Sequence, residues 1–300
     1  MIDAATSSTA VPTARQPVII LGAHRSGTSM LAELLDQLGL FQGCDLQGDH
    51  ESSHIVAINE TLLRRVNASW DNPLPMRDFL ACEPALRMTV LALRADLMSR
   101  RIRQFLGNAR SLQTFDRPWG WKDPRTIFTL PLWLRLFPGA RLVHIIRNGV
   151  DVAASLRARE RKLLEQRMSK FDARMTRFSL RPGLDRAGYK GSARCLSLER
   201  GFELWGEYLR QADQVLRGID NAIFTIRYED FVAEPRRHLH KLAEFCGLHG
   251  VSEAAVRQAV LAVNTSRATA FAADPALSAF YSSVKDDPWM RQFVYDTPPP

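Results

Sequence analysis

The chain has 300 residues, 46% of them hydrophobic and 24% charged, which is the composition of an ordinary globular protein with one large α/β domain or two modest ones. Its 40 Lys and Arg residues exceed its 32 Asp and Glu residues and give a formal charge of +8, which favours anionic partners. The four cysteines include no CxxC pair and no histidine at zinc spacing, which argues against a metal site and a disulfide framework.

The first 16 residues lack the apolar segment of a secretory signal and carry an acid near their start, so we expect a flexible tail over residues 1–16. No run in the sequence approaches the roughly 18 apolar residues that cross a bilayer. We therefore expect a cytoplasmic protein without a membrane span.

A loop of the phosphate-binding type follows the first predicted strand. The strand is the apolar run Val18–Leu21, and residues 30–38 after the loop repeat leucine and methionine at helical spacing. Between them, Gly22 and Gly27 stand at the spacing of a P-loop, but Thr28 occupies the position of its lysine. A strand that leads through such a loop to a helix N-terminus collects backbone N–H groups around one point, which is a site for an anion.

Arg25 is the candidate for the missing cation. It stands three residues before Thr28, at the tip of the loop, and its planar guanidinium can bridge two oxygens of a leaving phosphate. The alternative is an ordinary strand-to-helix turn in which Thr28 or Ser29 caps the helix. Such a turn does not explain an arginine and three hydroxyls together.

Strands and helices alternate along the rest of the chain, which predicts an α/β fold with a central, mostly parallel sheet covered by helices on both faces. Helical patterns cover residues 51–66, 84–106, 126–139, 150–166 and 235–246, and apolar strands cover residues 141–149 and 222–230. We expect one domain over residues 17–290, with a basic, solvated insertion around residues 157–200 and a C-terminal tail over residues 291–300.

Two motifs resemble those of the sulfotransferases that use 3′-phosphoadenosine 5′-phosphosulfate (PAPS), in their bacterial and carbohydrate-type branch. HRSGTS followed by MLAELL resembles the 5′-phosphosulfate loop of that family. RNGVDVAAS, from Arg147 to Ser155, resembles its strand that ends in arginine, with a serine eight residues later. The resemblance covers residues 17 to about 248, and it implies a P-loop-containing nucleotide-binding fold, PAPS as co-substrate and 3′-phosphoadenosine 5′-phosphate (PAP) as product.

By this resemblance, three groups of residues bind the donor. Arg147 and Ser155 clamp its 3′-phosphate, although Arg147 can instead pair with Asp151. Tyr228 belongs to a third similar stretch, IRYEDFVAEPRRHLHKLAEFCGL, and lies near the adenine as a stacking surface or packs in the sheet. The loop residues that hold the 5′-phosphosulfate are Arg25, Ser26, Gly27, Thr28 and Ser29.

The resemblance also implies a reaction without a metal. A sulfuryl group carries less negative charge than a phosphoryl group, so cations and N–H donors suffice for its in-line transfer. The neighbouring strand ends in Arg147 and not in a metal-binding acid. A general base must accept the proton of the acceptor hydroxyl. Glu51 is the first candidate, His50 the second and His54 a third, whereas Glu51 can also be a simple first-turn acid of a helix.

The acceptor is the part of the reaction that the sequence specifies least. Lys122 and Arg125 in GWKDPR are candidates to contact the transferred sulfate or an acidic acceptor, or they form an internal salt bridge through Asp123. The sequences of the loops expected to bind the acceptor do not indicate its identity, so the acceptor hydroxyl can belong to a sugar, a lipid, a natural product or a tyrosine. These loops are residues 41–54, 69–85 and 170–194. The sequence does not indicate the oligomeric state either.

Two other classes of function are open to the sequence. A P-loop kinase or nucleotide hydrolase that has replaced its lysine would require magnesium and act on ATP. A nucleic-acid-binding protein would use the basic segment 157–200, but this segment lacks a recognised module and interleaved aromatic side chains. We therefore expect a sulfotransferase before a kinase, and no nucleic-acid partner.

Overall fold

The computed structural model describes residues 9–175, 189 and 191–297. They form two compact units, one made of residues up to 146 together with residues 208–268, the other of residues 147–207 together with those from 269 onward. The expectation of a single domain over residues 17–290 stays a prediction.

The first unit is built on a four-stranded sheet in which all neighbouring strands are parallel. β1 and β2 are buried along their whole length, which explains why an unbroken apolar run predicted β1. Val18 pairs with Gly120 on one side and with Arg141 on the other, so the carboxyl ends of three strands meet at one edge. The strands β1 (Val18–Leu21), β2 (Gly120–Lys122), β3 (Arg141–Ile146) and β4 (Ile223–Arg227) lie in the order β2-β1-β3-β4.

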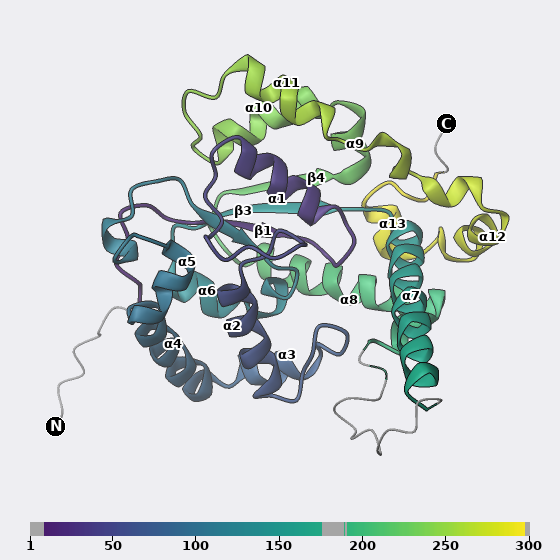
Figure 1. The fold of residues 1–300 in the computed structure, drawn as a ribbon, viewed down its shortest axis with the longest axis horizontal. Helices are drawn as coiled ribbons and strands as arrows, with labels where there is room; N and C mark the ends of the chain where they lie inside the picture. Colours follow the sequence, from purple (N-terminus) through teal and green to yellow (C-terminus); the bar gives the residue numbers. More distant parts are fainter. Residues whose placement is uncertain (1–8, 176–188, 190, 298–300) are drawn as a thin grey trace. The chain divides into compact units, whose positions relative to one another are not determined.

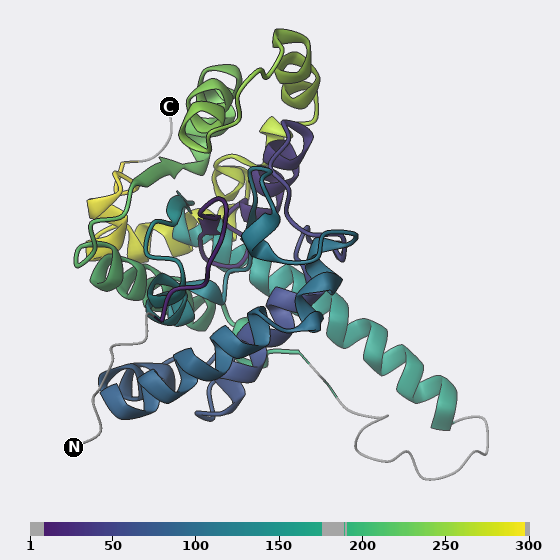
Figure 2. The ribbon, with the colours of Figure 1, turned by 90° about the vertical axis from the view of Figure 1, so that its left-hand side faces the viewer.

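Helices cover both faces of this sheet (Figure 1). α1 (Thr28–Gln37), α10 (Pro235–Phe245) and α11 (Glu253–Leu261) lie on one face. On the other lie α2 (Ser53–Arg64), α3 (Pro75–Ala81), α4 (Glu83–Leu97), α5 (Arg103–Leu106) and α6 (Thr126–Leu136). The turned view again has the green helices α10 and α11 above and the blue α4 below (Figure 2). The predicted class is confirmed, an α/β fold of the P-loop type with a parallel central sheet.

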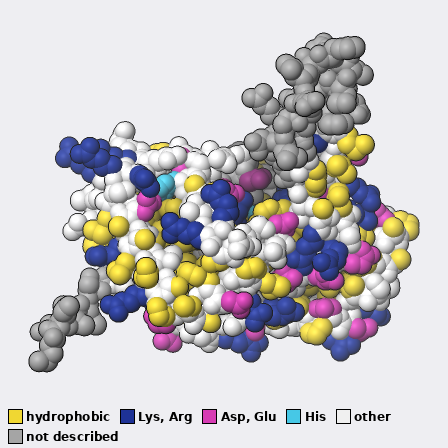
Figure 3. Space-filling model, turned by 90° about the horizontal axis from the view of Figure 1, so that it is seen from below, with side chains coloured by type: hydrophobic (Ala, Val, Ile, Leu, Met, Phe, Trp, Pro, Cys, Tyr) yellow, Lys and Arg dark blue, Asp and Glu magenta, His cyan; other side chains and the backbone are white. Residues whose placement is uncertain are grey.

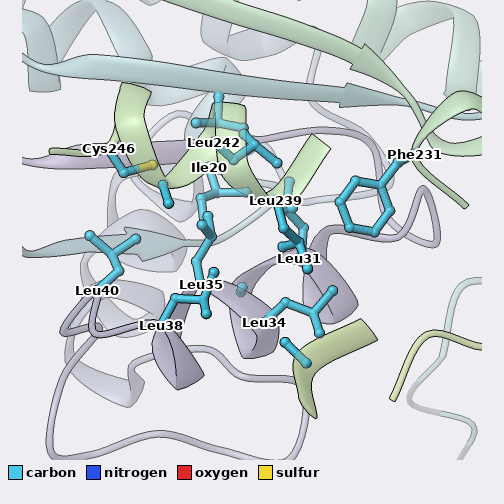
Figure 4. Close-up of a cluster of buried hydrophobic side chains, with 14 of the residues drawn as sticks. Ile20, Leu31, Leu34, Leu35, Leu38, Leu40, Phe231, Leu239, Leu242 and Cys246 are labelled. Carbon is cyan, nitrogen blue, oxygen red and sulfur yellow. The ribbon is translucent and has the colours of Figure 1, made fainter. Parts of the chain in front are cut away.

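The core between the sheet and α1 explains the leucine repeat of this helix. Leu31 and Leu35 are fully buried and pack with Ile20 of β1 and Leu239 of α10 (Figure 4). α1 ends where Gly39 takes a φ of 105° and donates its N–H to a carbonyl of the last helical turn at 2.9 Å. Glycine adopts this left-handed conformation without strain, so Gly39 ends the helix.

The prediction of a single helix over residues 84–106 is wrong. α4 ends at Leu97, and Ser99 then adopts an extended backbone. The Ser99 hydroxyl accepts the N–H of Arg101 at 3.1 Å and starts the short 3₁₀ helix η1 (Arg100–Ile102). Serine competes for backbone groups in this way, so it breaks a helical pattern that the hydrophobic residues alone would continue.

The strand predicted over residues 222–230 is too long. It ends at Arg227, because Tyr228 begins the helix α9 (Tyr228–Ala233), whose first turn carries two acids that favour a helix N-terminus. β2, which has only three residues, was not predicted. Short fully buried strands carry too little pattern to be recognised.

The second unit contains the long helix α7 (Gly149–Met175). A Cβ at Gly149 would lie 2.7 Å from Phe202 and from Trp205, so glycine lets α7 begin against these rings. The predicted insertion at residues 157–200 starts within α7, and its residues 176–188 and 190 lie outside the described part of the chain. The other helices that this unit holds, wholly or in part, are α8 (Leu198–Leu216), α12 (Pro275–Val284) and α13 (Pro288–Gln292).

Residues within both predicted tails are buried and make contacts within their own units. In the first unit, Val11 is 3% exposed and donates its N–H to the carbonyl of Leu136 at 2.8 Å. In the second, Tyr295 is buried and donates its N–H to the carbonyl of Met290 at 2.7 Å. Among the helices of the described segments, none has both the length and the apolar character that crossing a membrane requires.

Candidate active site

The loop after β1 depends on its two glycines. A Cβ at Gly22 would lie 2.7 Å from the carbonyl oxygen of Ile145, and one at Gly27 would lie 2.5 Å from the ring of Tyr228. Gly27 has a φ of 95° and Arg25 a φ of 70°, both in the left-handed region that glycine adopts easily and arginine does not. The predicted glycine spacing therefore has a steric cause, and the loop holds Arg25 in an unusual backbone conformation of the kind found at functional sites.

α1 begins directly after this loop. Gly27 is its N-cap and accepts the N–H of Leu31 at 3.1 Å, so the alternative in which Thr28 or Ser29 caps the helix is wrong. The N–H groups of a helix's first turn have no partner within the helix, and the positive end of the helix dipole lies there. Thr28 and Ser29 therefore begin the helix at a position that favours an anion.

A lysine from β2 reaches the hydroxyl of this first turn. The sheet register pairs Lys122 with Ile20 near the end of β1, and the Lys122 side chain is fully buried. Its Nζ donates to Ser29 Oγ at 3.0 Å and to Glu51 Oε1 at 2.8 Å. In P-loop nucleotide hydrolases the hydroxyl at the position of Ser29 binds Mg²⁺. Here the same hydroxyl accepts a hydrogen bond from an ammonium group, which supplies a cation that the loop sequence lacks.

Glu51 links this lysine to a second cation. Arg125 Nη1 lies 3.4 Å from Glu51 Oε2 and 2.9 Å from Asp123 Oδ1, so Arg125 does form the salt bridge with Asp123 that the sequence suggested. Burial raises the pKa of the Glu51 carboxyl, the Lys122 ammonium opposes this rise, and Asp123 adds to it. We call the group of Ser29, Glu51, Lys122, Asp123 and Arg125 the Lys122 cluster.

A buried asparagine on α2 fixes this cluster to the body of the unit. Asn59 is 0% exposed, and its Nδ2 donates to Asp123 Oδ2 at 2.8 Å and to Thr126 Oγ1 at 3.0 Å. Its Oδ1 accepts from Thr129 Oγ1 at 2.7 Å and from Trp133 Nε1 at 2.9 Å. The amide thus uses both of its ends, and it ties α2, which begins two residues after Glu51, to the start of α6.

The two candidate histidines contact residues outside the Lys122 cluster. His50 Nε2 is 3.5 Å from Asp36 Oδ2, near the end of α1. His54 donates its backbone N–H to Asp45 Oδ2 at 2.7 Å, and its ring lines a cavity between α2 and α4. Of the three predicted bases, Glu51 is therefore the one that contacts Lys122 and Arg125.

Aromatic side chains surround the base of the loop. Tyr228 is 4% exposed and belongs to the hydrophobic core, with its ring against Gly27. The ring of His24 lies 4.9 Å from that of Trp70 and 5.9 Å from that of Tyr208, and the Tyr208 hydroxyl donates to the Trp70 carbonyl at 2.8 Å. Tyr228 therefore has the packing role that was the alternative in the sequence, while its contact with adenine stays a prediction.

Arg147 and Ser155 belong to the second unit. Arg147 is 7% exposed, and its Nη2 lies 3.6 Å from Asp151 Oδ2, so the alternative ion pair is present. The Arg147 carbonyl accepts the indole N–H of Trp205 at 3.1 Å, which holds the backbone in place before α7. Burial raises the pKa of Asp151, and Arg147 opposes the rise. Ser155 lies within α7, and its role toward the 3′-phosphate stays a prediction, as does that of Arg147.

Sequence reasoning missed the contact between Lys122 and Ser29 and the role of Asn59. A signal for Asn59 was present, because Ile55, Asn59 and Leu63 stand at helical spacing with a polar residue in the apolar row. Lys122 follows a tryptophan in a short strand, and nothing local indicates that its ammonium reaches a loop 93 residues away.

This arrangement can bind an anion and accept a proton side by side. The loop and the first turn of α1 favour an anionic group, and Lys122 neutralises charge beside it. Glu51 is a partly buried carboxylate, 13% exposed, within hydrogen-bond distance of that lysine. In the part of the chain that the structure describes, no group of three or more His, Cys, Asp or Glu side chains is placed to hold a metal ion.

Comparisons with known proteins agree with this chemistry. A family model described as the sulfotransferase family matches residues 17–253. Among solved structures, the sulfotransferase domain from the curacin biosynthetic pathway is 19% identical with a TM-score of 0.45, over 87% of this chain and 81% of that one. Sulfotransferase STF1 from Mycobacterium tuberculosis is 16% identical with a TM-score of 0.48, over 85% of this chain and 72% of that one.

The sulfotransferase domain of an olefin synthase from Synechococcus PCC 7002 is 18% identical with a TM-score of 0.46, over 96% of this chain and 99% of that one. No curated protein matches the chain. All three TM-scores are below 0.5, so the family assignment depends on the family model and its match to residues 17–253.

Proposed function

The chain belongs to the sulfotransferase family, and we propose that it transfers the sulfuryl group of PAPS to the hydroxyl of an acceptor and releases PAP. The observation that carries the proposal is the position of the Lys122 ammonium, which donates to Ser29 beside the phosphate-binding loop and to the partly buried carboxylate of Glu51. A cation and a base are thereby held beside one anion-binding loop.

The donor is held first through its 5′-phosphosulfate. The N–H groups of Gly27, Thr28 and Ser29 and the guanidinium of Arg25 bind its oxygens, because loop and helix N-terminus favour an anion here. Ser26 shapes the loop around the donor, with its N–H donated to the carbonyl of Ala23 at 3.2 Å. Arg147 and Ser155 hold the 3′-phosphate and Tyr228 lies near the adenine, as the resemblance in the sequence implies. These assignments follow the motif positions, and calorimetric titration with PAP tests them.

The transfer itself is an in-line substitution at sulfur. Glu51 takes the proton of the acceptor hydroxyl while the acceptor oxygen forms a bond to sulfur. The bond between sulfur and the bridging oxygen of the 5′-phosphate breaks, and the electron pair stays on PAP. Lys122 and Arg25 neutralise the charge that grows on the departing phosphate, while Arg125 orients the Glu51 carboxylate.

A P-loop kinase or nucleotide hydrolase is the less favoured function. Such enzymes need the loop hydroxyl for Mg²⁺, whereas Ser29 Oγ lies 3.0 Å from the ammonium of Lys122. A second positive charge at this point would be repelled by the first. The acceptor is a carbohydrate, a lipid or a small natural product, and we propose a cytoplasmic enzyme that works without a metal or a nucleic-acid partner.

The function is tested with sulfur-labelled PAPS and a panel of hydroxyl acceptors in the presence of EDTA. We expect label in a sulfated acceptor and equimolar PAP, at a rate that added Mg²⁺ does not change. Mg²⁺-dependent transfer from γ-labelled ATP, with no transfer from PAPS, would show that the protein is a kinase and not a sulfotransferase.

A separate prediction concerns Asn59, which we propose positions Glu51. Asn59→Leu removes the four hydrogen bonds of a buried amide. Thr126, Thr129 and Trp133 keep other hydrogen bonds that compensate only in part, so we expect a loss of about 1–3 kcal/mol in the free energy of unfolding. The substitution also lets α2 shift against Asp123, so kcat should fall about tenfold or more while the KM for PAPS stays near the parent value. Urea unfolding and steady-state kinetics measure the two effects.

Gln42→Leu is the matched control for Asn59→Leu. Gln42 is also a buried carboxamide, 1% exposed, whose Nε2 donates to the carbonyl of Ala32 at 2.6 Å. Both variants lose a buried amide, but only Asn59 contacts the Lys122 cluster. An equal fall of kcat in the two variants would reduce Asn59 to a residue that only stabilises the fold.

A further inference from the structure

A cavity of about 440 Å³ lies between α2 and α4 in the first unit. His54, Ile58 and Arg65 line it from α2, and Leu93 and Asp96 line it from α4. An α-helix turns about 100° per residue, so Asn59 points about 140° around α2 from His54. The cavity therefore lies on one face of α2, and the contact of Asn59 with the Lys122 cluster lies on another face of the same helix.

The size and the middle of the cavity suit a small organic molecule. Cavities that bind such ligands range from about 300 to 1,000 Å³ and are lined by apolar side chains with a few polar ones. The middle of this one is lined by Ile58 and by Leu93, which is 6% exposed. On the molecular face that includes α4, hydrophobic side chains gather between basic and acidic ones (Figure 3).

One end of the cavity carries a buried histidine with one ring nitrogen that makes no hydrogen bond to the described residues. His54 is 7% exposed, and its buried Nε2 has no hydrogen-bond partner among the described residues. A buried polar group without a hydrogen-bond partner is unfavourable, so a ligand that supplies a partner gains affinity. Burial lowers the pKa of the ring, which keeps it neutral, and Asp96 at the same end is already paired with Arg101 at 2.9 Å. This end therefore suits a neutral polar group or a water molecule carried in with a ligand.

The other end carries an excess positive charge. Arg65 lines the cavity at the end of α2, and in residues 9–175, 189 and 191–297 no carboxylate lies within ion-pair distance of its guanidinium. The lining contains two arginines, Arg65 and Arg101, against one acid, Asp96. A guanidinium without a partner at the mouth of an apolar cavity is a recognition group for a carboxylate.

We propose that this cavity is a second ligand site, for a small amphipathic carboxylate whose apolar body lies on Ile58 and Leu93 and whose carboxylate pairs with Arg65. The site is separate from the one at which sulfuryl transfer is proposed, and it takes its ligand whether or not PAPS is bound. A ligand seated here contacts α2, which begins two residues after Glu51 and also carries Asn59, the partner of Asp123 in the Lys122 cluster.

The probes are 4-phenylbutyrate and its neutral analogue 4-phenylbutanamide, titrated calorimetrically into the full chain saturated with PAP. Neither probe has a hydroxyl, so neither is a sulfate acceptor. We expect saturable binding of the carboxylate and binding of the amide that is about tenfold weaker or more, because the amide lacks the charge-assisted contact. The result is independent of the proposed function, since the titration measures no transfer.

Three variants locate the bound probe. Arg65→Gln should lower the affinity for 4-phenylbutyrate to that for the amide, and Ala92→Trp, which fills the cavity from α4, should abolish binding of both. Arg87→Ala is the matched control, because Arg87 is an exposed arginine of α4 outside the lining, and it should bind like the parent.

Absence of saturable heat, equal affinity for the two probes, or unchanged affinity in Arg65→Gln would overturn the proposal. Arg65 is exposed at the end of a helix, so the glutamine variant folds and decides the matter even if Ala92→Trp does not fold.

Discussion

Replacing Glu51 by glutamine is expected to lower kcat by about 10²–10⁴-fold, the contribution typical of a general base. Glutamine keeps the size of glutamate, and its Oε1 can still accept the hydrogen bond from Lys122 that spans 2.8 Å in the parent. The neutral amide cannot take the proton of the acceptor hydroxyl. Kinetics at saturating PAPS should therefore show the loss in kcat, while calorimetry should find the Kd of PAP near its parent value.

Glu60→Gln is the control for this substitution. Glu60 also faces Arg125, with 3.4 Å between Oε1 and Nη2, but its side chain is 46% exposed and does not reach Lys122. We expect turnover near that of the parent. Near-normal turnover in Glu51→Gln would contradict the assignment and would move the proton acceptor to His50 or to another group.

Lys122→Met is expected to lower kcat by about 10²–10³-fold, as the loss of one preorganised donor at a developing anion does. Methionine fills a similar volume but removes the positive charge beside Ser29 and Glu51. The charge of Lys122 opposes the rise in the Glu51 pKa that burial causes, so its loss raises this pKa further. The base must be ionised, and the acidic limb of the pH–kcat profile should therefore move to higher pH.

A double variant separates catalysis from stability. Lys122→Met leaves a buried carboxylate with one cation fewer, which can cost about 3–5 kcal/mol in the free energy of unfolding. Adding Glu51→Gln removes that charge, and the double variant should regain stability without regaining turnover. An acidic limb that stays in place in Lys122→Met would show that the lysine does not act on Glu51.

The segment from β1 through the loop to α1 could be predicted because its sequence signals are local. Val18–Leu21 is apolar throughout since the strand is buried on both faces, and the glycine spacing reflects the close approach of Ile145 and Tyr228 to the loop backbone. The leucine repeat of α1 follows from the side of the helix that meets β1 and α10. Each of these features is determined by residues within a few positions of it in the sequence.

The Lys122 cluster could be predicted only in part, because its contacts join distant parts of the chain. The charges in GWKDPR made Lys122 and Arg125 candidate site residues. The partners of Lys122, however, are 71 and 93 residues away in the sequence. Asn59 meets Asp123 at a separation of 64 residues. Sequence spacing indicates which face of a helix a residue occupies, but it does not indicate which element is packed there.

The proposed function requires that this chain bind an adenosine donor through its 3′- and 5′-phosphates. Calorimetric titration with PAP tests it most directly, with adenosine 5′-monophosphate as the analogue that lacks the 3′-phosphate. We predict saturable binding of PAP by the parent, much weaker binding of the monophosphate, and weakened PAP binding in Arg147→Ala. No heat with PAP, or equal affinity for the two nucleotides, would contradict the account.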